Sequence, residues 1–167
     1  MLNALAAFIS DGERLIVIED TSEIQINKPH LVRFEERKAQ PDWPAVTIRD
    51  LLRASLRMRP DRILLGEVRG GEAFDFLQAL NTGHSGTLST IHANSGPLSL
   101  TRLTTCVLMS GVELPHKAVR SQIADGLHLL VHLERRKEKR VVTQVFAVKA
   151  YDAILDRYDL EPIDDTP

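Results

Sequence analysis

Short apolar runs that alternate with helical segments constrain the fold of this 167-residue chain more than any other feature. The expected strands cover residues 15–18, 63–65 and 87–92, of which the first two are apolar throughout, and a charged or imidazole side chain stands at or just beyond the end of each. Strands that are separated by helices pair in parallel through right-handed crossovers, and such strands are buried on both faces. The sequence therefore predicts an α/β fold with a mostly parallel sheet flanked by helices.

The segments around these strands are assigned from apolar spacing and from residues that end helices. Helices are expected at the N-terminus, over 48–56, from 70 to 83 and from 115 to 125. Residues 24–34 are expected to be extended, and residues 127–133 and 141–148 to form a C-terminal β-hairpin. The polar tail beyond Tyr158 is expected to fray.

The composition is that of one soluble globular domain, since 43% of the residues are hydrophobic and 26% are charged. The formal net charge of −2 provides no general attraction to nucleic acid or to anionic lipid. The longest apolar run is far shorter than the roughly 20 residues of a membrane span. We therefore expect one domain over residues 1–167, in the cytoplasm and without a nucleic-acid partner. The only cysteine, Cys106, is interpreted as a buried thiol without chemistry.

Candidate catalytic groups stand at the carboxyl ends of the expected strands. Glu19 and Asp20 end the first strand, Glu67 and then Arg69 follow the second, and His92 ends the third. Because parallel sheets bind ligands at the carboxyl ends of their strands, Glu19, Glu67 and His92 are expected to share one edge. A carboxylate that orients water or a magnesium shell, next to a cation, is what a nucleotide hydrolase requires. A strand-end acid also fits a capping role, so both interpretations remain open.

The segment from residue 81 to residue 95, NTGHSGTLSTIHANS, concentrates small, hydroxyl and imidazole side chains around the third strand. Such a mixture of side chains is uncommon in hydrophobic cores. His92, Asn94 and Ser95 would add three polar groups to the ligand edge, which favours a functional site over a structural histidine.

Two other patterns are compared with a structural interpretation. Arg49, Arg53 and Arg57 recur every four residues, which fits a solvated or carboxylate-paired helix face at least as well as an arginine finger toward a neighbouring subunit. His128 and His132 have helical metal-site spacing, but their neighbours indicate a strand, on which they lie about 13 Å apart. No metal site is predicted there, and the basic turn over 135–140 is interpreted as a solvated hairpin tip.

Three segments, residues 18–23, 62–69 and 82–95, resemble in order the acidic box, the Walker B region and the histidine box of the type II/IV secretion ATPase superfamily. The resemblance is strongest to the branch that assembles Flp (Tad) pili and to its conjugal-transfer relatives, and it covers nearly the whole chain. It implies a RecA-like P-loop NTPase core that binds ATP and Mg²⁺. It also implies a motor subunit of a secretion, pilus-assembly or conjugal-transfer machine.

The resemblance further implies roles and partners. Glu67 would polarise the attacking water, Glu19 with Asp20 would support water or metal binding, and His92 would sense the terminal phosphate. Arg69 is the preferred arginine finger toward a neighbouring subunit. The expected nucleotide-binding residues are Asp20, Glu23, His84 and Thr87. The expected partners are the other subunits of a homo-hexamer and inner-membrane platform proteins, through which the protein would associate peripherally with the membrane.

The phosphate-binding pattern G-x-x-x-x-G-K-[ST] does not occur in the chain. In the family this Walker A loop precedes the helix that begins here at Met1. The chain is therefore expected to be a partial C-terminal ATPase domain, without the N-terminal domain, and nearly inactive alone. The alternatives are a non-hydrolysing remnant or interface subunit and a DNA-dependent RecA-like motor. The aromatic content of 5% speaks against the base-stacking track of a DNA motor.

Overall fold

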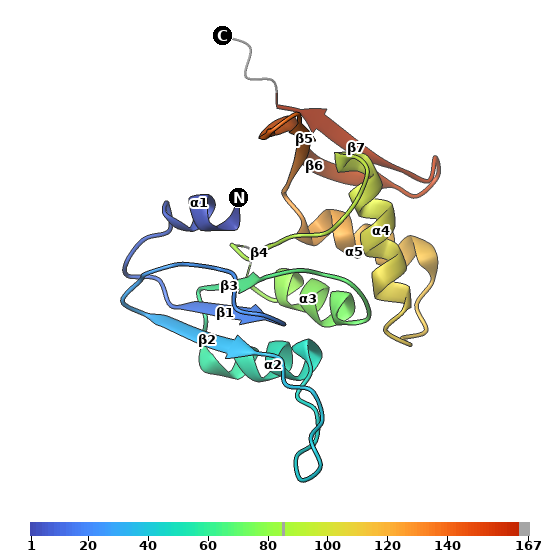
Figure 1. Cartoon of the computed structure of the whole chain (residues 1–167). Helices are drawn as coiled ribbons and strands as arrows, with labels where there is room; N and C mark the ends of the chain where they lie inside the picture. Colours follow the sequence, from blue (N-terminus) through green and yellow to red (C-terminus); the bar gives the residue numbers. More distant parts are fainter. Residues whose placement is uncertain (85, 164–167) are drawn as a thin grey trace.

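The computed structural model describes residues 1–84 and 86–163, whose elements are labelled in Figure 1. The helices are α1 (Leu2–Ala6), α2 (Ile48–Ser55), η1 (Leu56–Met58), α3 (Glu72–Asn81), α4 (Gly96–Leu108) and α5 (His116–Gly126). The strands are β1 (Leu15–Glu19), β2 (Leu31–Glu35), β3 (Arg62–Leu65), β4 (Leu88–Ser89), β5 (Leu129–Arg136), β6 (Lys139–Asp152) and β7 (Arg157–Pro162). Within the described ranges, no helix combines the length and the apolar content that a bilayer crossing requires.

A four-stranded parallel sheet in the order β2-β1-β3-β4 forms the core, as the sequence predicts. All residues of β1 are buried, which follows from its continuous apolar run. Its side chains alternate between two clusters: Ile16 and Ile18 face the cluster that includes α2, α3, α4 and α5, whereas Leu15 and Val17 face α1. Helices therefore cover both faces of the sheet (Figure 1).

The edge strands differ from the prediction. The extended segment forms a strand only over β2, where Leu31 pairs with Leu15. On the other edge, the predicted strand 87–92 is reduced to the two residues of β4. Beyond β4, Thr90 contacts the segment that follows β3: its hydroxyl donates to the Gly66 carbonyl over 2.6 Å, and its carbonyl accepts from the Val68 N–H over 2.8 Å. His92 consequently lies on a loop and not on a strand.

Helix α4 is an element that the sequence interpretation left unassigned. It begins after Ser95, whose hydroxyl accepts a hydrogen bond from the Leu98 N–H over 3.3 Å, and Pro97 occupies its first turn. Cys106 is buried in this helix, as predicted, and burial raises the pKa of its thiol.

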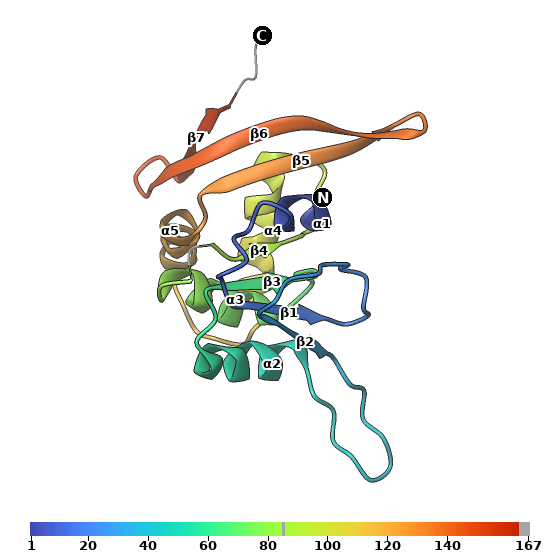
Figure 2. The ribbon, with the colours of Figure 1, turned by 90° about the vertical axis from the view of Figure 1, so that its left-hand side faces the viewer.

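The C-terminal unit is a three-stranded antiparallel sheet in the order β5-β6-β7. The predicted hairpin is present as β5 and β6, but the tail does not fray over 157–162, because β7 pairs with β6. Tyr158 and Leu160 alternate with acidic residues and pack against the core. In Figure 2 the β5–β6 hairpin extends beyond the helices, above the parallel sheet.

Candidate functional site

The carboxyl ends of β1, β3 and β4 meet at one edge of the parallel sheet. Glu19 is the last residue of β1, Glu67 lies just beyond β3, and His92 lies on the loop that follows β4. A cavity of about 500 Å³ opens at this edge, and all three side chains line it. The structure therefore confirms the predicted convergence, while the chemical roles of these residues stay predictions.

Glu67 is the centre of a chain of polar contacts across this cavity. One carboxylate oxygen, Oε1, lies 3.2 Å from His92 Nε2, and the other, Oε2, lies 2.7 Å from Arg69 Nη2. Arg69 Nη1 also donates to Asp20 Oδ2 over 2.6 Å. The hydrogen bond to Glu67, and the charges of Glu67 and Asp20, raise the pKa of the Arg69 guanidinium. Glu67 is mostly buried, whereas the His92 side chain is 91% exposed and stands at the rim.

Glu19 has a different environment, because its side chain is only 5% exposed. Its Oε1 accepts hydrogen bonds from the backbone N–H groups of Glu23 and Ile24, over 2.9 and 2.7 Å. Arg33 lies 3.7 Å from Oε2 and also donates to the Ile24 carbonyl. Glu19 thus fixes the loop that follows β1, including Asp20 and Glu23, which line the cavity.

Two close approaches fix the backbone around Glu67. A Cβ on Gly66 would lie 3.3 Å from the Glu19 side chain, which would have to shift by a few tenths of an ångström. A Cβ on Gly71 would lie 2.9 Å from the Ser110 backbone, which brings the start of α3 against the end of α4. Between them, the Glu72 carboxylate accepts hydrogen bonds from the N–H groups of Arg69 and Gly70.

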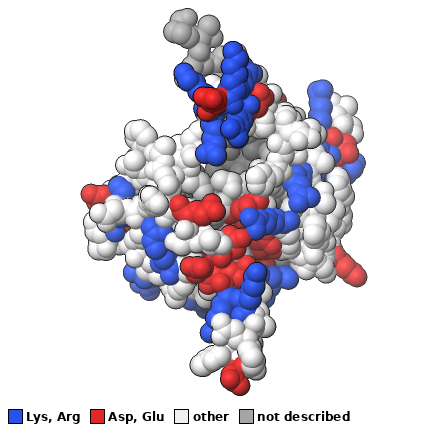
Figure 3. Space-filling model, in the orientation of Figure 1, with Lys and Arg blue, Asp and Glu red and all other residues white. Residues whose placement is uncertain are grey.

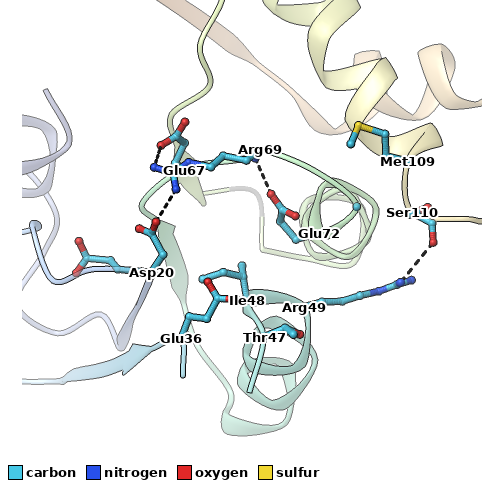
Figure 4. A pocket seen from close by; sticks show the side chains of 12 residues that line it. Asp20, Glu36, Thr47, Ile48, Arg49, Glu67, Arg69, Glu72, Met109 and Ser110 are labelled. Atoms are coloured by element: carbon cyan, nitrogen blue, oxygen red, sulfur yellow. Dashed lines mark hydrogen bonds and ion pairs between the residues drawn. The ribbon is translucent and has the colours of Figure 1, made fainter. Parts of the chain in front are cut away.

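A neighbouring cavity of about 370 Å³ shares Asp20, Glu67 and Arg69 with the first and extends toward α2. Figure 4 shows Arg49 at its far side, where the guanidinium donates to the Ser110 carbonyl over 3.4 Å. The two cavities share the charged side chains of Asp20, Glu67 and Arg69 at the carboxyl edge of the sheet.

The arginine stripe of α2 pairs with a carboxylate. Arg49 Nε and Arg53 Nε donate to the two oxygens of the buried Asp75 side chain, over 2.5 and 2.7 Å. This confirms the carboxylate-paired interpretation for both residues. Arg69 pairs with Glu67 and Asp20 of its own chain, and its action on a neighbouring subunit stays a prediction.

Two of the predicted nucleotide-binding residues do not reach the site. Thr87 lies before β4, at the opposite end from His92, and its buried hydroxyl accepts a hydrogen bond from the Ile63 N–H over 3.4 Å. His84 lies still earlier in the chain, and neither residue lines the two cavities. The ligand edge of a parallel sheet is its carboxyl end, and these residues stand at the other end. Among the predicted nucleotide-binding residues, only Asp20 and Glu23 line the cavity at this edge.

Sequence reasoning missed Arg140, which lines the larger cavity together with Glu67 and His92. The basic turn was interpreted as a solvated tip, and no local pattern distinguishes Arg140 from its neighbours. His132 lies on strand β5, as predicted, so the helical spacing that a shared metal with His128 requires is not present.

Comparison with known proteins shows extended similarity. The model of a family described as type II/IV secretion system protein matches residues 1–154. One relative is Rv3659c of Mycobacterium tuberculosis (strain ATCC 25618 / H37Rv), which is named a putative conjugal transfer protein. It is 40% identical over 141 residues, which are 84% of this chain and 40% of that protein. PtlH, a type IV secretion system protein of Bordetella pertussis, is 42% identical over 142 residues, or 81% of this chain and 41% of PtlH.

The chain is also similar to solved structures, among them the VirB11 ATPase from the Brucella suis type IV secretion system, in complex with sulphate. The TM-score is 0.78 at 35% sequence identity, and the match covers 87% of this chain and 43% of that one. The likeness confirms the predicted fold class. The chain thus spans about two fifths of the length of the relatives that it matches.

Proposed function

The chain belongs to the family of type II/IV secretion system proteins, and we propose that it forms part of an ATP-hydrolysing motor subunit. The observation that carries the proposal is the contact of Glu67 with both Arg69 and His92 at the carboxyl edge of a parallel sheet. Hydrolysis of a phosphoanhydride needs an acid that orients water and donors that face phosphate. The names of the relatives support a machine for secretion or conjugal transfer.

In the proposed reaction, a Glu67 oxygen accepts a hydrogen bond from a water molecule and aligns it with the terminal phosphorus of ATP. A bond forms between the water oxygen and phosphorus, while the bond to the bridging oxygen breaks and ADP leaves with its electron pair. The water proton passes to Glu67 and then to phosphate. His92 and Arg69 donate hydrogen bonds to phosphate oxygens, where negative charge has to be stabilised.

The donor set of the cavity fits Mg²⁺, which binds through one or two carboxylates together with phosphate oxygens and water. Asp20 and Glu19 supply carboxylate oxygens at the strand ends, and Asp20 is the more exposed of the two. These residues would hold the ion. When bound, it neutralises charge between the phosphates.

Nucleotide affinity in this proposal depends on a phosphate-binding loop ahead of Met1, since the chain itself contains no G-x-x-x-x-G-K-[ST] pattern. The 167-residue chain alone is therefore proposed to be nearly inactive. The working subunit would be a homo-hexamer with nucleotide between subunits. It would be a cytoplasmic protein that associates with the inner membrane through platform proteins of the machine.

The test uses a loop-bearing protein, in which a strand and a G-x-x-x-x-G-K-T segment are joined ahead of Met1. Phosphate release from ATP and ATP binding are measured for this protein and for its Glu67→Gln variant. Glutamine keeps the shape but loses the charge, so turnover should fall by about two orders of magnitude or more while ATP binding survives. Equal turnover of the two proteins contradicts the role of Glu67, and no turnover in either contradicts the proposed function.

A further inference from the structure

The tip of the β5–β6 hairpin carries a basic surface. Its cationic residues are Arg135, Arg136, Lys137, Lys139 and Arg140. Figure 2 shows the hairpin reaching past the helices on the side where the N-terminus lies. In Figure 3 this basic tip stands above an acidic patch on the same face. A distant part of the chain thus brings positive charge to the carboxyl edge.

Arg140 is the residue of this tip that lines the cavity beside Glu67 and His92. Successive side chains of a strand point to opposite faces, so its neighbour Lys139 points away from the face that Arg140 presents. Among the residues that the structure describes, the ion pairs of this cavity engage Arg69 and Arg33 but not Arg140.

The charges in this cavity explain why such a cation is needed. Four carboxylates line it, from Glu19, Asp20, Glu23 and Glu67, against the two guanidinium groups of Arg69 and Arg140. Even with a magnesium ion held by Glu19 and Asp20, Arg69 alone would leave an excess of negative charge in this lining, and that excess repels a phosphate. Arg69 is already shared between two of the carboxylates. Arg140 therefore supplies the uncommitted positive charge, in a planar fork that matches two phosphate oxygens.

We propose that Arg140 binds the terminal phosphate of ATP and so makes the C-terminal sheet part of the nucleotide site. This inference rests on the proposed ATP hydrolysis. Because Glu67 and His92 line the same cavity, Arg140 is assigned to the phosphate that is cleaved. The hairpin would then respond to the difference between ATP and ADP, because only ATP has the terminal phosphate that the Arg140 guanidinium binds.

The experiment compares the loop-bearing protein with its Arg140→Gln, Arg140→Lys and Lys139→Gln variants. Dissociation constants for ADP and for a non-hydrolysable ATP analogue are measured together with kcat and KM for ATP. Loss of a charged hydrogen-bond pair should weaken binding of the ATP analogue by about tenfold to a hundredfold in Arg140→Gln. ADP affinity should change little, and Arg140→Lys should recover part of the loss.

Lys139→Gln is the matched control, because it removes one positive charge from the adjacent position on the opposite face of the strand. It should bind the ATP analogue as the unchanged protein does. If Arg140→Gln and Lys139→Gln behave alike in a protein that hydrolyses ATP, this inference is overturned and the proposed function stands. A loop-bearing protein that neither binds nor hydrolyses ATP overturns both. Circular dichroism checks folding, and Arg140→Lys decides the outcome if Arg140→Gln misfolds. Affinity of Arg140→Lys for the ATP analogue equal to that of the unchanged protein overturns the inference, and ATP-selective weakening supports it.

Discussion

The two ion pairs of Asp75 join α2 to α3 beneath the candidate site, and Asp75→Asn tests them. The Asp75 side chain is buried, and each of its oxygens accepts a hydrogen bond from one arginine, Arg49 or Arg53. Asparagine has almost the same volume, but it has only one acceptor oxygen. Its NH₂ group would face the other guanidinium, so one charged hydrogen bond is lost and a donor meets a donor.

The expected magnitude follows from exposure. A hydrogen bond to a charged group contributes about 1.5–3 kcal/mol, and breaking a fully buried pair costs about 3–5 kcal/mol. The Arg49 and Arg53 side chains are 32% and 57% exposed, so water can solvate the guanidinium groups that lose their partner. We therefore expect the free energy of unfolding to fall by about 2 kcal/mol, which lowers Tm by roughly 4–8 °C.

Thermal unfolding of the 167-residue chain measures this change, with Arg57→Gln as control. Arg57 belongs to the same stripe but is exposed, so its substitution should change stability by less than about 0.5 kcal/mol. A double-mutant cycle of Asp75→Asn with Arg49→Gln should be non-additive because the residues are in contact. Equal Tm values for Asp75→Asn and Arg57→Gln, or strict additivity in the cycle, would refute the reasoning.

Two further predictions concern the backbone near the site and the start of α2. Gly71→Ala should lower the free energy of unfolding by about 1–3 kcal/mol, because its Cβ would clash with the Ser110 backbone. Gly70→Ala is the control, since its Cβ would make only ordinary van der Waals contacts. Chemical denaturation compares the two variants, and equal stability contradicts the close approach. Hydrogen bonds from the Thr47 side chain and backbone hold the pKa of Asp50 below its usual value. The contribution of the Asp50 carboxylate to the free energy of unfolding is therefore present above about pH 4 and is lost as pH falls through the folded-state pKa. The Tm difference between the unchanged chain and Asp50→Asn should therefore shrink below about pH 4, and a constant difference would exclude this origin.

The sequence predicts the central strands and the shared edge because both follow from local pattern. The run from Leu15 to Ile18 is apolar throughout, so it has to be buried on both faces, and parallel pairing then carries Glu19 to the ligand edge. The shortness of β4 is not predictable in this way. Its hydroxyl-rich sequence fits both a strand and a loop, and Thr90 bonds to Gly66 and Val68 beyond the end of β3 instead of extending the ladder.

Contacts between distant segments account for the rest. Tyr158 and Leu160 have the alternating spacing of a strand, but the acidic residues around them make the segment resemble a solvated tail. Its pairing with β6 identifies it as a strand. Arg140 reaches the cavity because the antiparallel pairing of β5 with β6 determines how far the hairpin extends and on which face of β6 Arg140 lies. No window of the sequence contains that information. Ser95 and Pro97, in contrast, are ordinary signals for the start of α4.

The proposed ligand has to compete with the contacts that now hold the site together. The two Glu67 oxygens face Arg69 and His92, the same groups that would donate to phosphate. When a terminal phosphate takes these donors, the Glu67 oxygens become free to accept a hydrogen bond from the attacking water. The exposed side chains of Arg69 and His92 can move, whereas Glu19 is held by two backbone N–H groups and stays in place. Binding of the terminal phosphate by Arg69 and His92 would therefore release the Glu67 oxygens that activate the water, so the two events would be coupled.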